Sequence, residues 1–183
     1  PQEEPVYVCM TSDFFLPEAD EWRSEAWAMI KERQDLSFVI ETKREHRFFK
    51  ALPGDWGDGY ENVTILCSVE IQRRADDRIP AFLKLPVRHK GILCEPLLEK
   101  LVLDAYLKTG EIAQVLCGGE QGADARVCDF AWVLELMNQC VNCGVAFRFL
   151  RTGTFFRKGN RIYRIAEEEQ EEQARRAGVD YTP

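Results

Sequence analysis

The chain has 183 residues, of which 45% are hydrophobic and 30% are charged, and its formal net charge is −7 at pH 7. This composition is typical of a globular domain and excludes a disordered chain or a collagen. No apolar stretch reaches the ~20 residues that a membrane-spanning helix needs, so we expect no membrane partner.

Six short apolar segments recur along the chain and predict strands. They are rich in Val, Ile, Leu, Phe and Cys and do not alternate with polar residues, which is typical of parallel strands that are covered on both faces. The predicted strands are Val6–Met10, Phe38–Thr42, Val63–Glu70, Gly91–Glu95, Gln114–Glu120 and Val145–Leu150.

Helical patterns lie between these strands. In Pro17–Arg33 one face of the predicted helix carries Trp22, Ala26, Trp27 and Ile30, and acidic residues occupy the first turn. One or two short helices are expected within Glu95–Lys108. The other predicted helices are Arg44–Leu52, Arg73–Leu85 and Asp129–Cys143.

The alternation of strand and helix predicts a parallel sheet with right-handed crossovers. A complete eight-unit barrel takes about 250 residues, and only six units fit, so we predict an α/β fold with a partial (β/α) barrel of six parallel strands in residues 6–150. Residues 151–183 are predicted to form a β-hairpin, which turns at Gly159, and an acidic helix over Ala166–Ala177. We expect residues 1–183 to be a single domain.

Seven cysteines without an apolar signal segment indicate a reducing, cytoplasmic compartment. Cys140 and Cys143 lie at the C-terminal end of a predicted helix, where the helix dipole disfavours the thiolate that a redox motif needs. A structural zinc ion would need two more ligands. No metal site is predicted from them. Small core residues are expected at Cys9, Cys67, Cys94 and Cys117.

Three successive predicted strands finish with a glutamate, namely Glu70, Glu95 and Glu120. Ligands of parallel α/β folds bind outside the carboxyl ends of the strands. Carboxylates gathered there repel one another unless a cation, a shared proton or a ligand compensates, which is typical of a functional site. The alternative is that each glutamate caps a helix or forms an ion pair with Lys43, Arg44 or Arg151.

A glycine-rich segment, Gly118-Gly119-Glu120-Gln121-Gly122, follows the fifth strand. Glycines let a backbone pass close to a ligand and offer amide groups to an anion. The segment is not a dinucleotide-binding fingerprint, because the next predicted helix begins only near Asp129. It therefore adds Gly118 and Gly119 to the candidate ligand-binding residues.

One segment is positively charged although the whole chain has a net negative charge: residues 148–164 contain six basic residues and no acidic one. Aromatic residues lie between them, and this combination can hold a phosphate backbone and stack bases. The alternative is a solvated face that pairs with the acidic helix after it. The candidate nucleic-acid contacts are Arg148, Arg151, Arg157, Lys158, Arg161 and Arg164.

Several segments, in this order, resemble an uncharacterised group that is described as phage protein, gene-product thirty-seven/sixty-eight family. The resemblance runs from about Val6 to Gly153. That group is related to radical S-adenosylmethionine (SAM) enzymes. The resemblance is carried by Phe38–Arg44, Val69-Glu70, Asp77–Pro80, Glu95–Leu98, Gly118–Arg126 and Asn138–Phe147.

The resemblance implies a partial (β/α) barrel with SAM and a [4Fe–4S] cluster at its mouth. The family's cysteine cluster precedes the first strand and has no match here, and the family's Phe-Lys-Gln-x-Gly pattern is replaced by residues 149–153, Phe-Leu-Arg-Thr-Gly, which removes the lysine. We therefore expect no cofactor in this chain alone, and the start at Pro1 without Met reads as the continuation of a longer protein. The residues implied to line a SAM or substrate site are Thr42, Lys43, Glu70, Glu95, Gly118, Gly119 and Glu120.

These observations predict the barrel portion of a radical-SAM-like protein that binds a small molecule at the carboxyl ends of its strands. Two alternatives stay open. One is a non-catalytic module that binds nucleic acid or protein through the basic hairpin. The other is a Mg²⁺-dependent enzyme with oxygen ligands from Glu70, Glu95 and Glu120 and with Lys43 as the base. Substrate and oligomeric state do not follow from the sequence.

Overall fold

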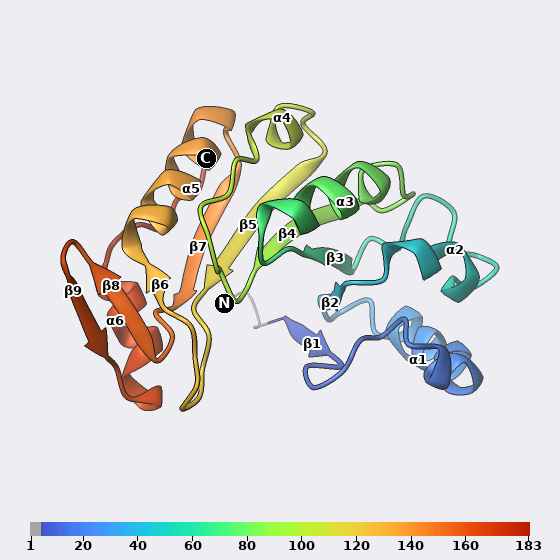
Figure 1. Cartoon of the computed structure of the whole chain (residues 1–183). Coiled ribbons are helices and arrows are strands. Elements are labelled where there is room, and N and C mark those ends of the chain that lie inside the picture. Colours follow the sequence, from blue (N-terminus) through green and yellow to red (C-terminus); the bar gives the residue numbers. More distant parts are fainter. Residues whose placement is uncertain (1–4) are drawn as a thin grey trace.

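The computed structural model describes residues 5–183 and contains a six-stranded, all-parallel sheet that curls into a half-barrel (Figure 1). The strand order is β1-β2-β3-β4-β5-β7, so neighbouring strands follow the order of the chain. This confirms the predicted partial barrel. The strands are β1 (Val6–Val8), β2 (Phe38–Thr42), β3 (Val63–Ser68), β4 (His89–Cys94), β5 (Ile112–Gly118) and β7 (Ala146–Arg151).

Helices cover the convex face of this sheet (Figure 1). The main core lies between them and the sheet, because alternate residues of each strand point to that side; buried examples are Ile40, Ile65 and Ile92. The helices are α1 (Asp20–Glu32), α2 (Phe48–Ala51), α3 (Gln72–Phe82), α4 (Asp104–Leu107) and α5 (Phe130–Cys143), with 3₁₀ turns at Pro17–Ala19 and Glu45–Arg47.

The concave face of the half-barrel carries a smaller apolar cluster. Four neighbouring strands contribute one buried residue each, and Leu150 of β7 packs against them. The four are Val39, Leu66, Leu93 and Leu116. Toward the carboxyl ends of the strands, the concave face becomes polar.

The chain also contains a second, three-stranded sheet and a C-terminal helix. The second sheet consists of β6 (Cys128–Asp129), which precedes α5, and of β8 (Phe155–Lys158) and β9 (Arg161–Arg164), which follow the half-barrel; Gly159 has φ 60° at the hairpin turn. After a 3₁₀ turn at Glu167–Glu169, α6 (Gln170–Arg176) packs on β7. The hairpin and the helix confirm the prediction, whereas the two-residue strand β6 was not foreseen because so short a pairing has no sequence period.

The first strand and the first helix differ from the predictions. Val6 is 40% exposed, because β1 is an edge strand with β2 as its only neighbour in the sheet. Cys9 lies beyond β1, is exposed and has φ 59°, so it is not a core residue. Trp22 of α1 is 66% exposed; the buried stripe contains Trp27, Ile30 and, unexpectedly, Arg23.

Arg23 is buried because its guanidinium closes the turn before α1. Its Nε donates a hydrogen bond to the carbonyl of Phe14 at 2.9 Å, and Nη2 donates to the carbonyl of Leu16 at 2.5 Å. Asp20 forms an ion pair with it. The hydrogen bonds and the counter-charge offset the cost of burying the arginine.

One other segment also differs from its predicted form. Arg44–Leu52 forms a 3₁₀ turn and a single helical turn instead of one helix, whereas Glu95–Lys108 contains one short helix, α4, as expected. No helix within residues 5–183 is long and apolar enough to cross a membrane.

Candidate functional site

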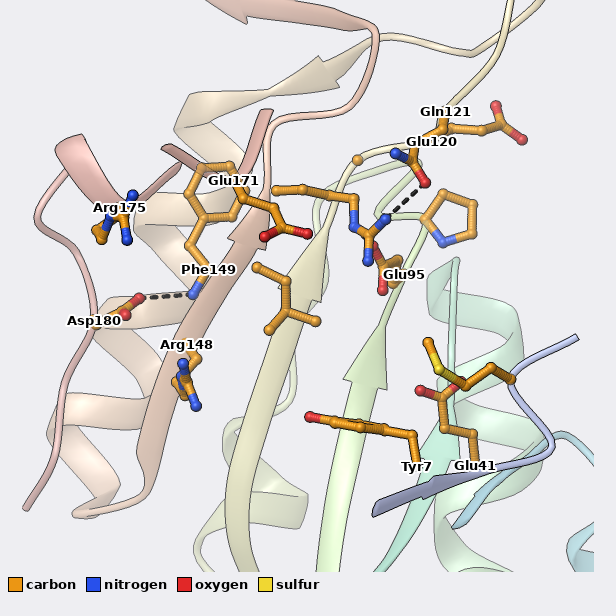
Figure 2. Close-up of a pocket in the computed structure, with 15 residues that line it drawn as sticks. Tyr7, Glu41, Glu95, Glu120, Gln121, Arg148, Phe149, Glu171, Arg175 and Asp180 are labelled. Carbon is orange, nitrogen blue, oxygen red and sulfur yellow. Dashed lines mark hydrogen bonds and ion pairs between the residues drawn. The ribbon is translucent and has the colours of Figure 1, made fainter. Parts of the chain in front are cut away.

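A cavity of about 650 Å³ opens at the carboxyl ends of the parallel strands (Figure 2). Its walls come from β1, β2 and β7, from the segments that follow β4 and β5, and from α6. Figure 2 shows Tyr7 and Glu41 on one side, and Arg148, Arg175 and Asp180 on the opposite side. Glu41 therefore faces Arg148 and Arg175 across a space large enough for a small molecule, although the acidic Asp180 lies on the side of the arginines.

Glu95 stands at the centre of this cavity. Its side chain is 21% exposed, and its Oε1 lies 2.8 Å from Nε of Arg151 on β7. Burial raises the pKa of Glu95; the positive charge of Arg151 opposes this shift, while Glu41 and Glu171 add to it. The carboxylate is thus held between one guanidinium and two like charges.

Gly118 is required by the position of Glu95. A Cβ atom on Gly118 would overlap the carboxylate of Glu95. Gly119 is similarly constrained, since a Cβ there would overlap the carbonyl of Thr152. These glycines permit close packing of neighbouring segments; Gly119 also lines the cavity. Gly118 thus packs against Glu95 and is not part of the cavity lining.

Glu41 is a cavity residue that the sequence analysis missed. It lies on the concave face of β2, two residues after Val39, and is partly buried. It forms no hydrogen bond or ion pair with any residue in 5–183, and burial raises its pKa although Lys43 and Arg151 oppose the shift. The available signal was a single carboxylate inside an otherwise apolar strand.

Glu120 lines the cavity, but its carboxylate is bound within its own loop. It accepts hydrogen bonds from the backbone N–H of Arg126 at 2.7 Å and from Nε and Nη2 of the same arginine at 2.8 and 2.5 Å. These bonds lower the pKa of Glu120 to about 2. Glu120 is therefore a fixed negative charge at neutral pH, with a partner that the sequence analysis did not name.

Glu70 and Lys43 form an ion pair with each other outside this cavity. Glu70 also accepts from Nη1 of Arg78 at 3.3 Å. Thr42 donates to the carboxylate of Asp13 at 3.1 Å and does not line the cavity either. The structure thus brings Glu95, Gly119 and Glu120 together and leaves Thr42, Lys43, Glu70 and Gly118 out of the lining.

The predicted set of three glutamates is divided among different partners. Glu95 is paired with Arg151, Glu120 with Arg126, and Glu70 with Lys43 and Arg78. In the part of the chain that the structure describes, no three His, Cys, Asp or Glu side chains are grouped as metal ligands would be.

The buried thiols lie under the convex face of the half-barrel, away from the cavity lining. Burial raises the pKa of Cys67, Cys128 and Cys140 to about 12. Burial also raises the pKa of Cys94 and Cys117 well above its ordinary value. These cysteines are neutral, small core residues, as predicted for the three in strands, and Cys128 joins them.

The basic segment is split between two surfaces. Arg148 and Arg151 line the cavity on β7, whereas the other four cations lie on the hairpin β8–β9. Of the interleaved aromatic residues, Phe149 and Phe156 are only 3% and 8% exposed.

Comparison with known proteins identifies one family. A family model described as "Protein of unknown function (DUF5131)" matches residues 1–181. No curated protein and no solved structure matches the chain.

Proposed function

The chain belongs to the DUF5131 family of proteins of unknown function, and we propose that it is the barrel portion of a radical-SAM-like protein that binds SAM in the cavity at the carboxyl ends of its strands. One observation carries the proposal: a cavity of about 650 Å³ in which partly buried carboxylates face arginines. Its position and size are those of ligand sites in parallel α/β folds.

The charges of SAM fit this lining. SAM carries two cationic groups, a sulfonium and an ammonium, and one carboxylate. Glu41 and Glu95 are the acids that would hold the cationic groups, and Glu41 has no ion-pair partner among the described residues. Arg148, which also forms no ion pair within residues 5–183, would hold the carboxylate. Of the residues implied by the family resemblance, Gly119 and Glu120 belong to the same lining.

A [4Fe–4S] cluster does not fit the described residues. Such clusters are bound by thiolates, and the cavity lining contains no cysteine. Cys9, just beyond β1, is exposed, but the cysteines under the convex face are buried and neutral. The proposal for this chain is therefore limited to binding and orienting SAM.

Titration calorimetry with SAM tests the proposal. We expect saturable binding with one site per chain, and binding of S-adenosylhomocysteine should be weaker because its sulfur is neutral. Glu41→Gln and Arg148→Gln should each weaken SAM about tenfold, which corresponds to about 1.4 kcal/mol. Glu25→Gln, on the exposed surface of α1, is the matched control and should bind as the unmodified chain does.

Two outcomes would contradict the proposal. One is the absence of binding heat at millimolar SAM. The other is equal affinity in the cavity variants and the control, which would place the site elsewhere on the molecule.

A further inference from the structure

A second cavity, of about 410 Å³, lies between the hairpin β8–β9, the start of α5 and helix α6. It shares no lining residue with the first cavity. Phe130, Phe156 and Tyr163 supply aromatic rings, while Lys158, Arg164 and Arg176 supply positive charge. The only acidic residue of this lining within the described chain is Glu169. In a protein of net charge −7, this cavity is a local exception.

The positive charges of the hairpin are only partly neutralised. Arg157 forms an ion pair with Asp129 at 3.4 Å, and outside the hairpin Arg176 forms one with Glu172 at 2.8 Å. By contrast, Lys158, Arg161 and Arg164 form no ion pair with any residue from 5 to 183. Three cations of a two-stranded ribbon are therefore available to an anionic partner.

An exposed aromatic ring lies among these three cations. Every residue of β9 is exposed, and the side chain of Tyr163 is 45% exposed. Tyr163 is paired with Phe156 across the hairpin, and Arg161 with Lys158, so these four side chains point to one face of the ribbon, on which Phe156 is buried. By the same alternation Arg164 points to the other face, but at the end of β9 it lines the second cavity together with Lys158 and Tyr163. The Nζ of Lys158 lies 5.2 Å from the centre of the Phe130 ring, which keeps this cation next to the aromatic wall.

We propose that the hairpin and the second cavity bind single-stranded nucleic acid, with a base stacked on Tyr163 and phosphates held by Lys158, Arg161 and Arg164. Every base presents a π-face to an aromatic ring, whereas duplex bases are stacked on each other and cannot reach Tyr163. The same combination of exposed ring and unpaired cations argues against an acidic peptide, which would need only the charges. The proposal does not depend on the ligand of the first cavity.

The neighbouring acidic turn limits the length of the bound strand. Glu167, Glu168 and Glu169 are exposed directly after the hairpin, and they repel a phosphate chain on that side. The bound strand therefore covers a few nucleotides and runs along β9, away from the turn Glu167–Glu169.

Fluorescence anisotropy with labelled 12-nucleotide oligo(dT) and oligo(U), in 50 mM salt, tests this inference. The double variant Arg161→Ser/Arg164→Ser should bind at least tenfold more weakly, and the slope of log K against log salt should become shallower by about 1.4, because each lost contact with a single strand contributes about 0.7. Tyr163→Ala should weaken binding about tenfold and leave the salt slope unchanged, since stacking releases no counterions.

The matched control is Arg73→Ser/Arg74→Ser on α3, which removes the same charge from two exposed arginines of the convex side. It should bind as the unmodified chain does. The inference is overturned by any of four results: no binding in 50 mM salt, an equal loss in the control, full binding by Tyr163→Ala, or a duplex that binds as tightly as the single strand. None of these results bears on SAM binding to the first cavity.

Discussion

At the scale of single residues, Glu41 is the clearest case of a side chain that costs stability where it stands. Its carboxylate is partly buried on the concave face and has no hydrogen-bond or ion-pair partner within residues 5–183. Burial raises its pKa above the ordinary value of 4.5, so the folded protein binds this proton more tightly than the unfolded chain. The cost of burying Glu41 is therefore absent below about pH 4.5, where the carboxyl is protonated. The protein loses stability as the pH rises through the folded-state pKa and the buried carboxyl becomes charged.

Glu41→Gln should therefore stabilise the protein at pH 7 and raise its Tm, by about 2–4 °C for each 1 kcal/mol gained in a chain of this length. The gain should disappear at pH 4, where Glu41 is largely protonated. Thermal unfolding followed by circular dichroism between pH 4 and 8 measures this, with the exposed Glu25→Gln as the control. A gain of the same size at both pH values would show that the charge of Glu41 is not the cause. A stability gain with weaker SAM binding is the expected behaviour of a ligand-binding residue.

At the scale of elements, one buried side chain joins α5 to the segment before α4. Gln139 is 9% exposed; its Oε1 accepts from the N–H of Leu103 at 2.6 Å, and its Nε2 donates to the carbonyl of Leu101 at 2.8 Å. This segment follows β4 and contains little regular structure, so its buried backbone groups depend on a side chain for hydrogen bonds.

Replacing Gln139 by Met keeps the volume but leaves two buried backbone groups unpaired. We expect a loss of about 2–4 kcal/mol in the free energy of unfolding, from about 1–2 kcal/mol for each group. Urea unfolding measures the loss, and the amide of Leu103 should exchange its hydrogen faster. Gln34→Met removes an exposed hydrogen bond to the carbonyl of Lys31 and should cost less than about 0.5 kcal/mol. Equal losses in the two variants would refute this role of Gln139.

At the scale of the whole molecule, the half-barrel and the C-terminal part are connected at β7. Helix α6 packs on this strand, and Tyr181 and Phe147 exchange backbone hydrogen bonds at 2.8 and 2.9 Å along its edge. The hydrophobic core includes Phe156 of the second sheet and Ala174 of α6 together with the strands of the half-barrel. A shared core favours a single cooperative unit, as the predicted single domain requires.

This prediction is tested by unfolding the Trp132→Phe variant in urea. Its tryptophan fluorescence comes from Trp22, Trp27 and Trp56, all in the N-terminal third, while far-UV circular dichroism reports on the whole chain. The two transitions should have the same midpoint and slope, because two-state unfolding has no populated intermediate. Separate midpoints would indicate that the hairpin and α6 unfold independently of the half-barrel.

The sequence by itself determined the features that depend on near neighbours in the chain. Apolar segments at regular intervals predicted the six strands, and Gly159 predicted the hairpin turn; both were confirmed. These signals are local, because strand and turn preferences act over two to eight residues. The carboxyl ends of the strands could be identified in the same way, and the first cavity lies there.

Only the tertiary structure decided which of these side chains meet. Glu70 and Glu95 follow consecutive strands in the same manner, yet Glu70 is paired with Lys43 and Arg78, whereas Glu95 reaches Arg151, which is 56 positions away in the chain. Glu41 had the sequence context of a buried strand and became a cavity residue because the sheet curls toward an open concave side. Pairing of charges depends on strand register, on sheet curvature and on the paths of the connecting segments, and the period of a single strand contains none of these.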